Sequence, residues 1–308
     1  MKQVLCLLYH RIISLNQDVF NIAISPSIFE EQIACLSKKY NIIRFEDDWN
    51  DTVDGKNIVI TFDDGYYDNY EVALPILKKY QVPATFFIST GYIGKSEEFW
   101  WDKLITLLTV KKQYPVQYHL KNELYDYIWQ TDSVEKRLNM IKSMHTLLRL
   151  ENYQIHNKWL GEIEKWADIS YDEISDISLK NRSLSVEELQ KMAQESLVTI
   201  GGHTVHHASL GGLSLQEQEK EIKESIDTLS TILKKNIEVF SYPFGGKCDY
   251  TQDTYSILKK YGIKKAATTE SRQYNSMLDY KYEIPRWTVN SIDTENFERK
   301  IEELFKEQ

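Results

Sequence analysis

The chain has 308 residues, of which 42% are hydrophobic and 27% are charged, and its formal net charge is −9. This composition is typical of a globular protein, and the acidic balance offers no sign of a nucleic-acid-binding surface, which is normally basic. No stretch approaches the ~18 apolar residues of a membrane-spanning helix, and the length suffices for one large α/β domain with an insertion or for two domains.

Apolar runs alternate with amphipathic segments along most of the chain, and this alternation predicts a parallel α/β sheet. The first expected helix has Ser27 as its N-cap with Glu30 three residues later, a capping-box pattern. Expected strands lie at residues 3–9, 57–62, 83–88, 197–201, 237–242, 265–268 and 282–289, and expected helices at residues 27–40, 67–80, 214–235, 253–261 and 294–306.

Residues 97–195 interrupt the alternation. The segment contains Phe99, Trp100 and Trp101 near its start and is rich in tryptophan, tyrosine and charged residues. We predict a largely helical insertion within a single domain that spans residues 1–308. Lids near active sites exclude water, so the insertion could be a substrate lid. An oligomer surface is an equally good interpretation, and the sequence does not settle the oligomeric state.

Two adjacent carboxylates, Asp63 and Asp64, follow the strand expected at 57–62 and precede Gly65. Parallel α/β folds place their chemistry at the C-terminal ends of strands. Two anions so close together are unfavourable unless a cation lies between them or one carries a proton. Asp-Asp-Gly is also a common turn sequence, so the pair alone does not decide between a site and a turn.

Three histidines, His203, His206 and His207, follow the strand expected at 197–201. His203 and His207 are four residues apart, the spacing of one helical turn, so both imidazoles can lie on one face. His-x-x-x-His is a frequent geometry for a divalent metal. With one aspartate it would supply three ligands and leave positions open for water and substrate, and the other aspartate would remain available as a base.

The chain resembles a known family at three motifs. Thr61-Phe-Asp-Asp-Gly65 and His203-Thr-Val-His-His207 are similar to the first two motifs of the polysaccharide deacetylases, which are carbohydrate esterase family 4 or NodB-homology domains. Residues 240–245, Phe-Ser-Tyr-Pro-Phe-Gly, resemble the third motif, and the motifs keep the family's order within residues 56–290. The resemblance implies a distorted, incomplete (β/α) barrel, usually of seven strands.

The resemblance also implies roles for individual residues. Asp63 matches the general base that activates a metal-bound water. Asp64, His203 and His207 match the metal ligands. His206 matches no ligand and is expected to support the site or to lie at the surface.

The third motif supplies further candidates and one departure. The backbone N–H of Phe244 matches a donor to the oxyanion, and Tyr242 is expected to contact the substrate. The family usually has an arginine that orients the base at the position of Ser241 in this chain. Arg286 or Arg11 could replace it, although an ordinary salt bridge is an equally good interpretation of Arg286.

A second departure concerns the general acid. The family's last motif usually carries a histidine, but the strand expected at 282–289 has none. The strand at 3–9 ends in Tyr-His-Arg and resembles the opening strand of a permuted branch of the family, in which the acid-carrying motif lies at the N-terminus. His10 is therefore the candidate general acid, a role that suits histidine near neutral pH. The alternative is a core histidine that caps a strand.

Together these assignments predict a metal-dependent hydrolase that removes N-acetyl groups from an amino sugar. The carbohydrate partner would be a glycan or a lipid-linked glycan precursor, the latter implying peripheral contact with a membrane. Zinc is the expected cofactor, and cobalt, nickel or iron would suit the same ligands. Two interpretations stay open: the same site acts on an O-acetyl ester or a formamido sugar, or the chain is a non-catalytic sugar-binding protein.

The three cysteines, Cys6, Cys35 and Cys248, show neither close pairing nor metal-binding spacing, which favours reduced thiols. The N-terminal apolar stretch is interrupted at residue 9 by Tyr-His-Arg, and no signal-cleavage site is evident. We therefore predict a cytoplasmic protein.

Overall fold

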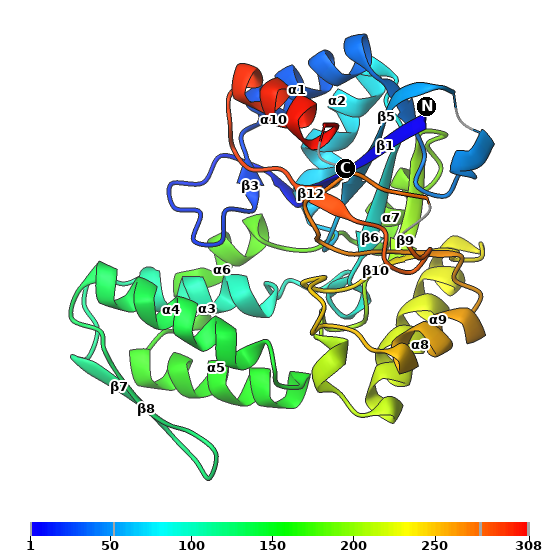
Figure 1. Ribbon diagram of the computed structural model, residues 1–308. Helices are drawn as coiled ribbons and strands as arrows, with labels where there is room; N and C mark the ends of the chain where they lie inside the picture. The colour runs from blue at the N-terminus through cyan, green and yellow to red at the C-terminus, as the bar shows by residue number, and fades with distance from the viewer. Residues whose placement is uncertain (1, 52, 277–278, 307–308) are drawn as a thin grey trace. The chain divides into compact units, whose positions relative to one another are not determined.

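Seven parallel strands form the sheet that carries the expected motifs (Figure 1). Their order is β11-β10-β9-β6-β5-β1-β12, and a short additional strand, β4 (Asn41–Ile43), pairs with β5. The sheet is a nearly closed, distorted (β/α) barrel, so the predicted fold is confirmed. The strands are β1 (Lys2–Tyr9), β5 (Gly55–Phe62), β6 (Ala84–Ile88), β9 (Val198–Gly202), β10 (Val239–Ser241), β11 (Lys265–Ala267) and β12 (Arg286–Thr288).

The computed structural model describes residues 2–51, 53–276 and 279–306, so both ends of the expected 1–308 domain lie outside the described residues. The chain divides into two units. The first unit comprises Met1–Gly94 and Leu184–Gln308 and contains the barrel, and the second comprises Lys95–Ser183.

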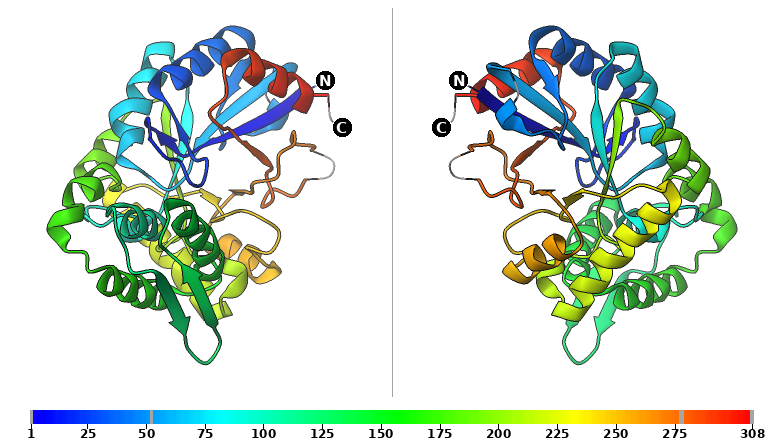
Figure 2. Two further views of the ribbon diagram at one scale, coloured as in Figure 1. Left: turned by 90° about the vertical axis from the view of Figure 1, so that its left-hand side faces the viewer. Right: turned by 90° about the vertical axis from the view of Figure 1, so that its right-hand side faces the viewer.

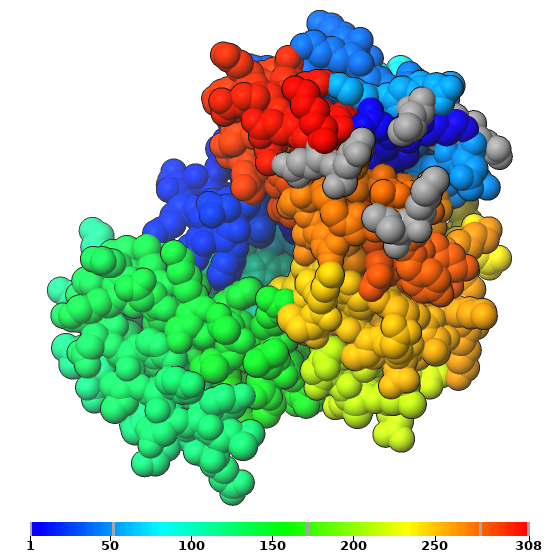
Figure 3. Space-filling model, in the orientation of Figure 1, coloured from blue at the N-terminus to red at the C-terminus, as the bar shows by residue number. Residues whose placement is uncertain are grey.

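Helices surround the strands of the first unit (Figure 2). The first and the last of them, α1 and α10, lie side by side (Figure 3). A turn of π-helix at Asn69–Ala73 precedes α2, where the sequence predicted one continuous helix over 67–80. The helices are α1 (Pro26–Lys39), α2 (Leu74–Tyr80), α7 (Val186–Met192), α8 (Leu215–Leu233), α9 (Gln252–Lys260) and α10 (Thr294–Leu304), and a two-stranded parallel sheet pairs β2 (Arg11–Ile12) with β3 (Ala23–Ile24).

The N-cap of helix α1 lies two residues earlier than its sequence pattern predicted. Ser25, not Ser27, is the N-cap, and its hydroxyl accepts a hydrogen bond from Ile28 N–H. Pro26 occupies the first helical position, where its fixed φ fits the helix and its missing N–H costs nothing. Helix α8, by contrast, begins where the expected 214–235 range does, because Ser214 and Glu217 form a capping box.

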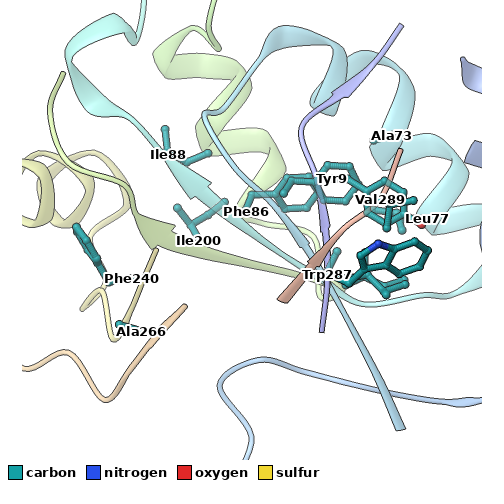
Figure 4. Close-up of a cluster of buried hydrophobic side chains, with 14 of the residues drawn as sticks. Tyr9, Ala73, Leu77, Phe86, Ile88, Ile200, Phe240, Ala266, Trp287 and Val289 are labelled. Atoms are coloured by element: carbon teal, nitrogen blue, oxygen red, sulfur yellow. The ribbon is translucent and has the colours of Figure 1, made fainter. Parts of the chain in front are cut away.

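The barrel core explains why the strand sequences are almost continuously apolar. Strands of a parallel sheet are buried on both faces, and the last six residues of β1 and of β5 are all buried. Tyr9, Phe62 and Phe86, from three neighbouring strands, stack with centroid separations of 5.4 and 4.6 Å. Figure 4 labels Tyr9 and Phe86 within this core. Full burial of each such side chain contributes about 1.5–3 kcal/mol. The stack therefore holds Phe62 rigidly in the core, and with it the backbone that leads into Asp63.

The second unit is mainly helical, as predicted, but it also contains an antiparallel hairpin that the sequence analysis missed. It begins at Lys95 and ends at Ser183, before the end of the expected 97–195 segment, because α7 packs on α8 within the first unit. Its elements are α3 (Trp100–Thr109), α4 (Val134–Leu148), α5 (Tyr153–Ala167), α6 (Tyr171–Lys180) and the hairpin of β7 (Gln117–Lys121) and β8 (Asp126–Gln130).

Candidate functional site

The functional residues expected from the sequence lie where strands of the first unit end. Asp63 and Asp64 directly follow β5, and His203 directly follows β9. The ladder of backbone hydrogen bonds continues past the strand ends: Asp63 N–H donates to Tyr9 O at 3.0 Å, and His203 N–H to Ile88 O at 3.2 Å. The sheet itself therefore fixes where these residues leave the strands.

Three predicted metal ligands come together at these strand ends. Candidate ligand atoms of Asp64, His203 and His207 all lie within 4.8 Å of one another, and all three residues are buried. Asp64 Oδ1 is 3.5 Å from His203 Nε2 and 3.4 Å from His207 Nε2. Side chains separated by about 140 residues thus converge on one small volume.

The segment that carries the two histidines is not the helical turn that the four-residue spacing suggested. It is a loop, in which Thr204 and His207 have φ values of 61° and 56°. The loop still brings the two imidazole centroids to 4.9 Å. The spacing therefore identified two histidines whose side chains do lie together, but it predicted the wrong local structure.

The cluster fits a divalent cation. Asp64 Oδ1 and His203 Nε2 are buried without a hydrogen-bond partner, which is costly unless something else binds them. His203 Nδ1 donates to Ser241 O at 2.8 Å, which leaves Nε2 to act as a ligand. Burial favours the neutral imidazole of His203, but Asp63 and Asp64 outweigh burial and raise its pKa. The surroundings thus demand positive charge.

Asp63 is held in a different way from Asp64. The Arg286 guanidinium binds it with two hydrogen bonds, Nη1 to Oδ1 and Nη2 to Oδ2, each 2.7 Å long. Burial alone would raise the pKa of Asp63, but Arg286 and His203 lower it to about 2. Asp63 is therefore ionised and fixed in orientation at neutral pH.

Of the two arginines that the sequence offered for this role, the structure places Arg286 beside Asp63. Arg286 is fully buried, and its remaining donors bind Thr268 O, Thr61 Oγ1 and Ser241 Oγ. Arg11 instead binds the carboxylate of Asp68 at 3.1 Å.

Ser241 occupies the position where the family usually has arginine. Its hydroxyl accepts from Arg286 Nη2 at 2.7 Å and donates to Asp63 Oδ2 at 3.0 Å. The small side chain leaves room for a guanidinium that arrives from β12. Sequence analysis recorded Ser241 only as a departure, and its place in the third motif was the signal that it belongs to the site.

The structure gives no support to the predicted contact between the Tyr242 side chain and a substrate. Its side chain is fully buried, stacks on Tyr250 at 4.4 Å, and its hydroxyl donates to Tyr282 O. Neighbouring strand residues point to opposite faces. Because Ser241 faces Asp63, Tyr242 faces the core on the other side.

Phe244, the candidate oxyanion donor, lies beside the cluster. Its ring centroid is 4.7 Å from that of His207. Its backbone has φ of 61°, and Thr269 Oγ1 donates to its carbonyl at 2.7 Å. The turn at Phe244 is thus held by contacts outside the third motif.

The other two predicted residues lie around the cluster. His10 follows the end of β1, Asn69 Nδ2 donates to its carbonyl at 2.7 Å, and a positive charge on its ring lowers the pKa of Asp63. His206 points to Glu221, whose Oε1 lies 2.7 Å from His206 Nδ1. His206 therefore supports the loop, as expected.

Backbone strain is concentrated at the site. Four of the eight non-glycine residues with positive φ in the described part of the chain belong to it: Asp64, Thr204, His207 and Phe244. Such conformations cost of order 1–3 kcal/mol each and persist where the surroundings impose them, often at functional sites.

The fold and the strand-end cluster place the protein among α/β-barrel enzymes whose chemistry lies at the C-terminal ends of the strands. The family model described as polysaccharide deacetylase matches residues 50–120 and 153–266, more than half of the chain. The chain therefore belongs to the polysaccharide deacetylase family, a family of hydrolases, and the resemblance noted in its three motifs is confirmed.

Curated relatives agree with this placement. A Bacillus subtilis (strain 168) protein, YxkH, named as a polysaccharide deacetylase, is 25% identical over 215 residues, which cover 70% of this chain and 45% of the relative. The poly-beta-1,6-N-acetyl-D-glucosamine N-deacetylase of Staphylococcus aureus (strain MSSA476) is 24% identical over 273 residues, 85% of this chain and 68% of the relative. The chain thus spans about half of the first relative's length.

A solved structure shares the fold. The Streptococcus pyogenes deacetylase PplD, solved in complex with acetate, superposes with a TM-score of 0.61 at 18% identity, and the match covers 97% of this chain and 98% of that one.

Within the described residues, none of the helices combines the length and the hydropathy that crossing a bilayer demands.

Proposed function

We propose that this chain is a metal-dependent N-deacetylase that hydrolyses N-acetyl groups of an amino-sugar polymer. One observation carries the proposal: neighbouring aspartates have different surroundings, with Asp64 beside His203 and His207 and Asp63 bound by Arg286. A metal ligand next to an ionised base is what metal-assisted amide hydrolysis requires. The name of the S. aureus relative supports the amide bond and the amino-sugar substrate.

Asp64, His203 and His207 would hold one divalent ion, and zinc suits one carboxylate and two imidazoles. Cobalt, nickel and iron accept the same ligands. When bound, the ion supplies Lewis acidity, which polarises a carbonyl and lowers the pKa of a coordinated water. Proton transfer and orientation then fall to the protein's own side chains.

Asp63 acts as the general base, because its carboxylate accepts the proton that the attacking water loses. Arg286 and Ser241 bind its oxygens, and the pKa of about 2 keeps the group ionised at neutral pH. A group with so low a pKa is a weak base. The arrangement therefore favours fixed orientation and constant ionisation over proton affinity.

Two further groups complete the reaction. The backbone N–H of Phe244 donates to the carbonyl oxygen as negative charge develops on it. His10, in its protonated form, gives its proton to the nitrogen of the departing sugar as the carbon–nitrogen bond breaks. The products are acetate and a free amino sugar. Asn69 holds the backbone of His10 at the end of β1, beside the strand that carries Asp63.

The substrate that we propose is a polymer of N-acetylglucosamine. A lipid-linked precursor carries the same acetamido group and would require peripheral contact with a membrane. Soluble oligomers and lipid-linked glycans, offered separately, distinguish the two substrates, because only the second requires a vesicle surface for turnover.

The proposal is tested by metal analysis of the purified protein, followed by acetate release from N-acetylglucosamine oligomers with and without a chelator. We expect about one divalent ion per chain and release of acetate from the oligomers. The chelator should stop the release, and added zinc should restore it. If protein stripped of its metal released acetate at the same rate with and without the chelator, the proposal would be contradicted.

A further inference from the structure

Glu221, on helix α8, holds the segment between the two candidate histidine ligands. Its Oε2 accepts hydrogen bonds from Val205 N–H and His206 N–H, both 2.9 Å long, and its Oε1 lies 2.7 Å from His206 Nδ1. The Glu221 side chain is only 14% exposed. Hydrogen bonds to a carboxylate are stronger than those between neutral groups. One side chain therefore fixes both the backbone and a ring of this segment.

The opposite side of the segment is held by backbone groups. Gly91 N–H donates to Val205 O at 2.7 Å, and Thr90 N–H donates to Thr204 O at 3.1 Å. A Cβ atom at Gly91 would lie 2.7 Å from Val205 O, which is closer than real contacts allow. The close approach therefore needs glycine, and the segment lies between residues 90–91 and Glu221.

The segment needs these contacts because its backbone is strained. Thr204, its first residue, and His207, which directly follows it, have φ values of 61° and 56°, which residues with a side chain rarely adopt. Such a conformation persists only when the surroundings impose it. A relaxed loop would carry His207 away from Asp64, whose Oδ1 lies 3.4 Å from His207 Nε2.

We infer that Glu221 is a positioning residue for the candidate metal centre: it sets His207 relative to His203 and Asp64 without touching the ion. The inference rests on the proposed function, since it concerns the same centre. It makes Glu221 a determinant of metal affinity rather than of chemistry. A residue that only packs α8 on the loop would change stability and leave the coordination of a bound metal unaltered.

The test uses metal-free full-length protein and compares wild type with Glu221→Ala, Glu221→Gln and Glu224→Ala. Glu224 is an exposed glutamate on the same helix and serves as the matched control. Zinc affinity is measured by competition with a chromophoric chelator, and geometry by the absorption spectrum of the cobalt(II) protein. Folding of each variant is checked by circular dichroism.

We expect Glu221→Ala to weaken zinc binding about 10- to 100-fold, the usual cost of losing a group that supports metal ligands, and to alter the cobalt spectrum. Glu221→Gln keeps one oxygen for the two N–H groups, so its loss should be smaller, and Glu224→Ala should match wild type. Should Glu221→Ala fail to fold, Glu221→Gln decides. If the folded Glu221 variants kept the zinc affinity and the cobalt spectrum of wild type, the role of Glu221 would be refuted and the proposed function would stand. If the wild-type protein bound no metal, the proposed function itself would be refuted.

Discussion

The two units of the protein bury acidic and basic side chains in different ways. In the first unit, Asp63 and Arg286 are both buried and form a bidentate pair. In the second unit, Glu98 is buried among neutral donors, accepting from Thr106 at 2.8 Å and Asn181 at 2.6 Å. The buried Arg137 of that unit binds the carbonyls of residues 108 and 131 instead of an acid.

As a consequence, the pKa values of Asp63 and Glu98 shift in opposite directions. Burial opposes the charge of both, but Arg286 and His203 together outweigh burial and lower the pKa of Asp63 to about 2. Burial prevails at Glu98 and raises its pKa, although neutral hydrogen bonds reduce the rise. For these two carboxyl groups, the difference comes from the Arg286 guanidinium, which binds Asp63 directly, whereas Thr106 and Asn181 offer Glu98 only neutral donors.

Arg286→Met should break this difference with the largest effect, because it leaves Asp63 buried without a cation. In wild type the lowered pKa of Asp63 stabilises the fold at every pH above 3.8, the ordinary pKa of an aspartate. This stabilisation is lost as the pH falls through about 2. In the variant, His203 still opposes burial but the guanidinium is lost, so the pKa of Asp63 should rise above its wild-type value and less stability should be gained as the pH rises. We expect a loss of about 3–5 kcal/mol at pH 7 and a smaller loss at pH 4, measured by chemical denaturation.

Arg137→Met is the control for that experiment, since Arg137 is a buried arginine that binds carbonyls. Its cost should not grow between pH 4 and pH 7. Equal destabilisation of Arg286→Met at both pH values would show that Arg286 does not govern the ionisation of Asp63.

Asp63→Asn should abolish most activity while leaving the metal ligands in place. General-base catalysis contributes about 10²–10⁴-fold, and we expect a fall in kcat of that size. The variant should bind zinc as wild type does, because Asp63 is not in the Asp64, His203 and His207 group. Wild-type turnover in Asp63→Asn, measured by acetate release, would remove the base assignment.

Glu98→Gln should have the smallest effect and show the opposite pH dependence to Arg286. A raised pKa means that Glu98 stabilises the fold fully below its unfolded pKa near 4.5, and this contribution is lost as the pH rises through the folded value. At pH 5 the variant should be about 1 kcal/mol less stable, because its amide replaces one acceptor by a donor. At pH 8 that deficit should shrink or reverse.

Denaturation at the two pH values measures this change, and the exposed neighbour Glu97 provides the control Glu97→Gln, which should show no pH-dependent difference. A deficit in Glu98→Gln that stays constant from pH 5 to pH 8 would mean that Glu98 keeps an ordinary pKa.

Much of the barrel and the grouping of Asp64, His203 and His207 could be predicted from the sequence, because strand ends carry short, specific motifs. The choice between Arg11 and Arg286 could not be predicted, because both arginines flank apolar strands. The pairing of β12 with β1 is what brings Arg286 into the barrel beside Asp63. The burial of the Tyr242 side chain was not predicted, because a motif gives the order of residues without showing which face of the strand each one occupies. The helical turn expected at His203 and His207 failed because spacing does not reveal positive φ.

The second unit shows the other limit of sequence analysis. Its hairpin alternates polar and apolar residues only on β7, where Tyr118 and Leu120 are buried between exposed neighbours. Every residue of β8 is at least partly exposed, so that strand carries no such pattern. Pairing between the two strands, not local periodicity, defines the hairpin.

The most direct test of the central claim is anomalous diffraction at the zinc edge from crystals of the zinc-loaded protein. The account predicts one strong peak at about 2.0–2.2 Å from a carboxylate oxygen of Asp64 and an imidazole nitrogen of each of His203 and His207. It also predicts that Asp63 remains on Arg286 and outside the coordination sphere. A zinc peak elsewhere in an active crystal, with none at these three residues, would contradict it.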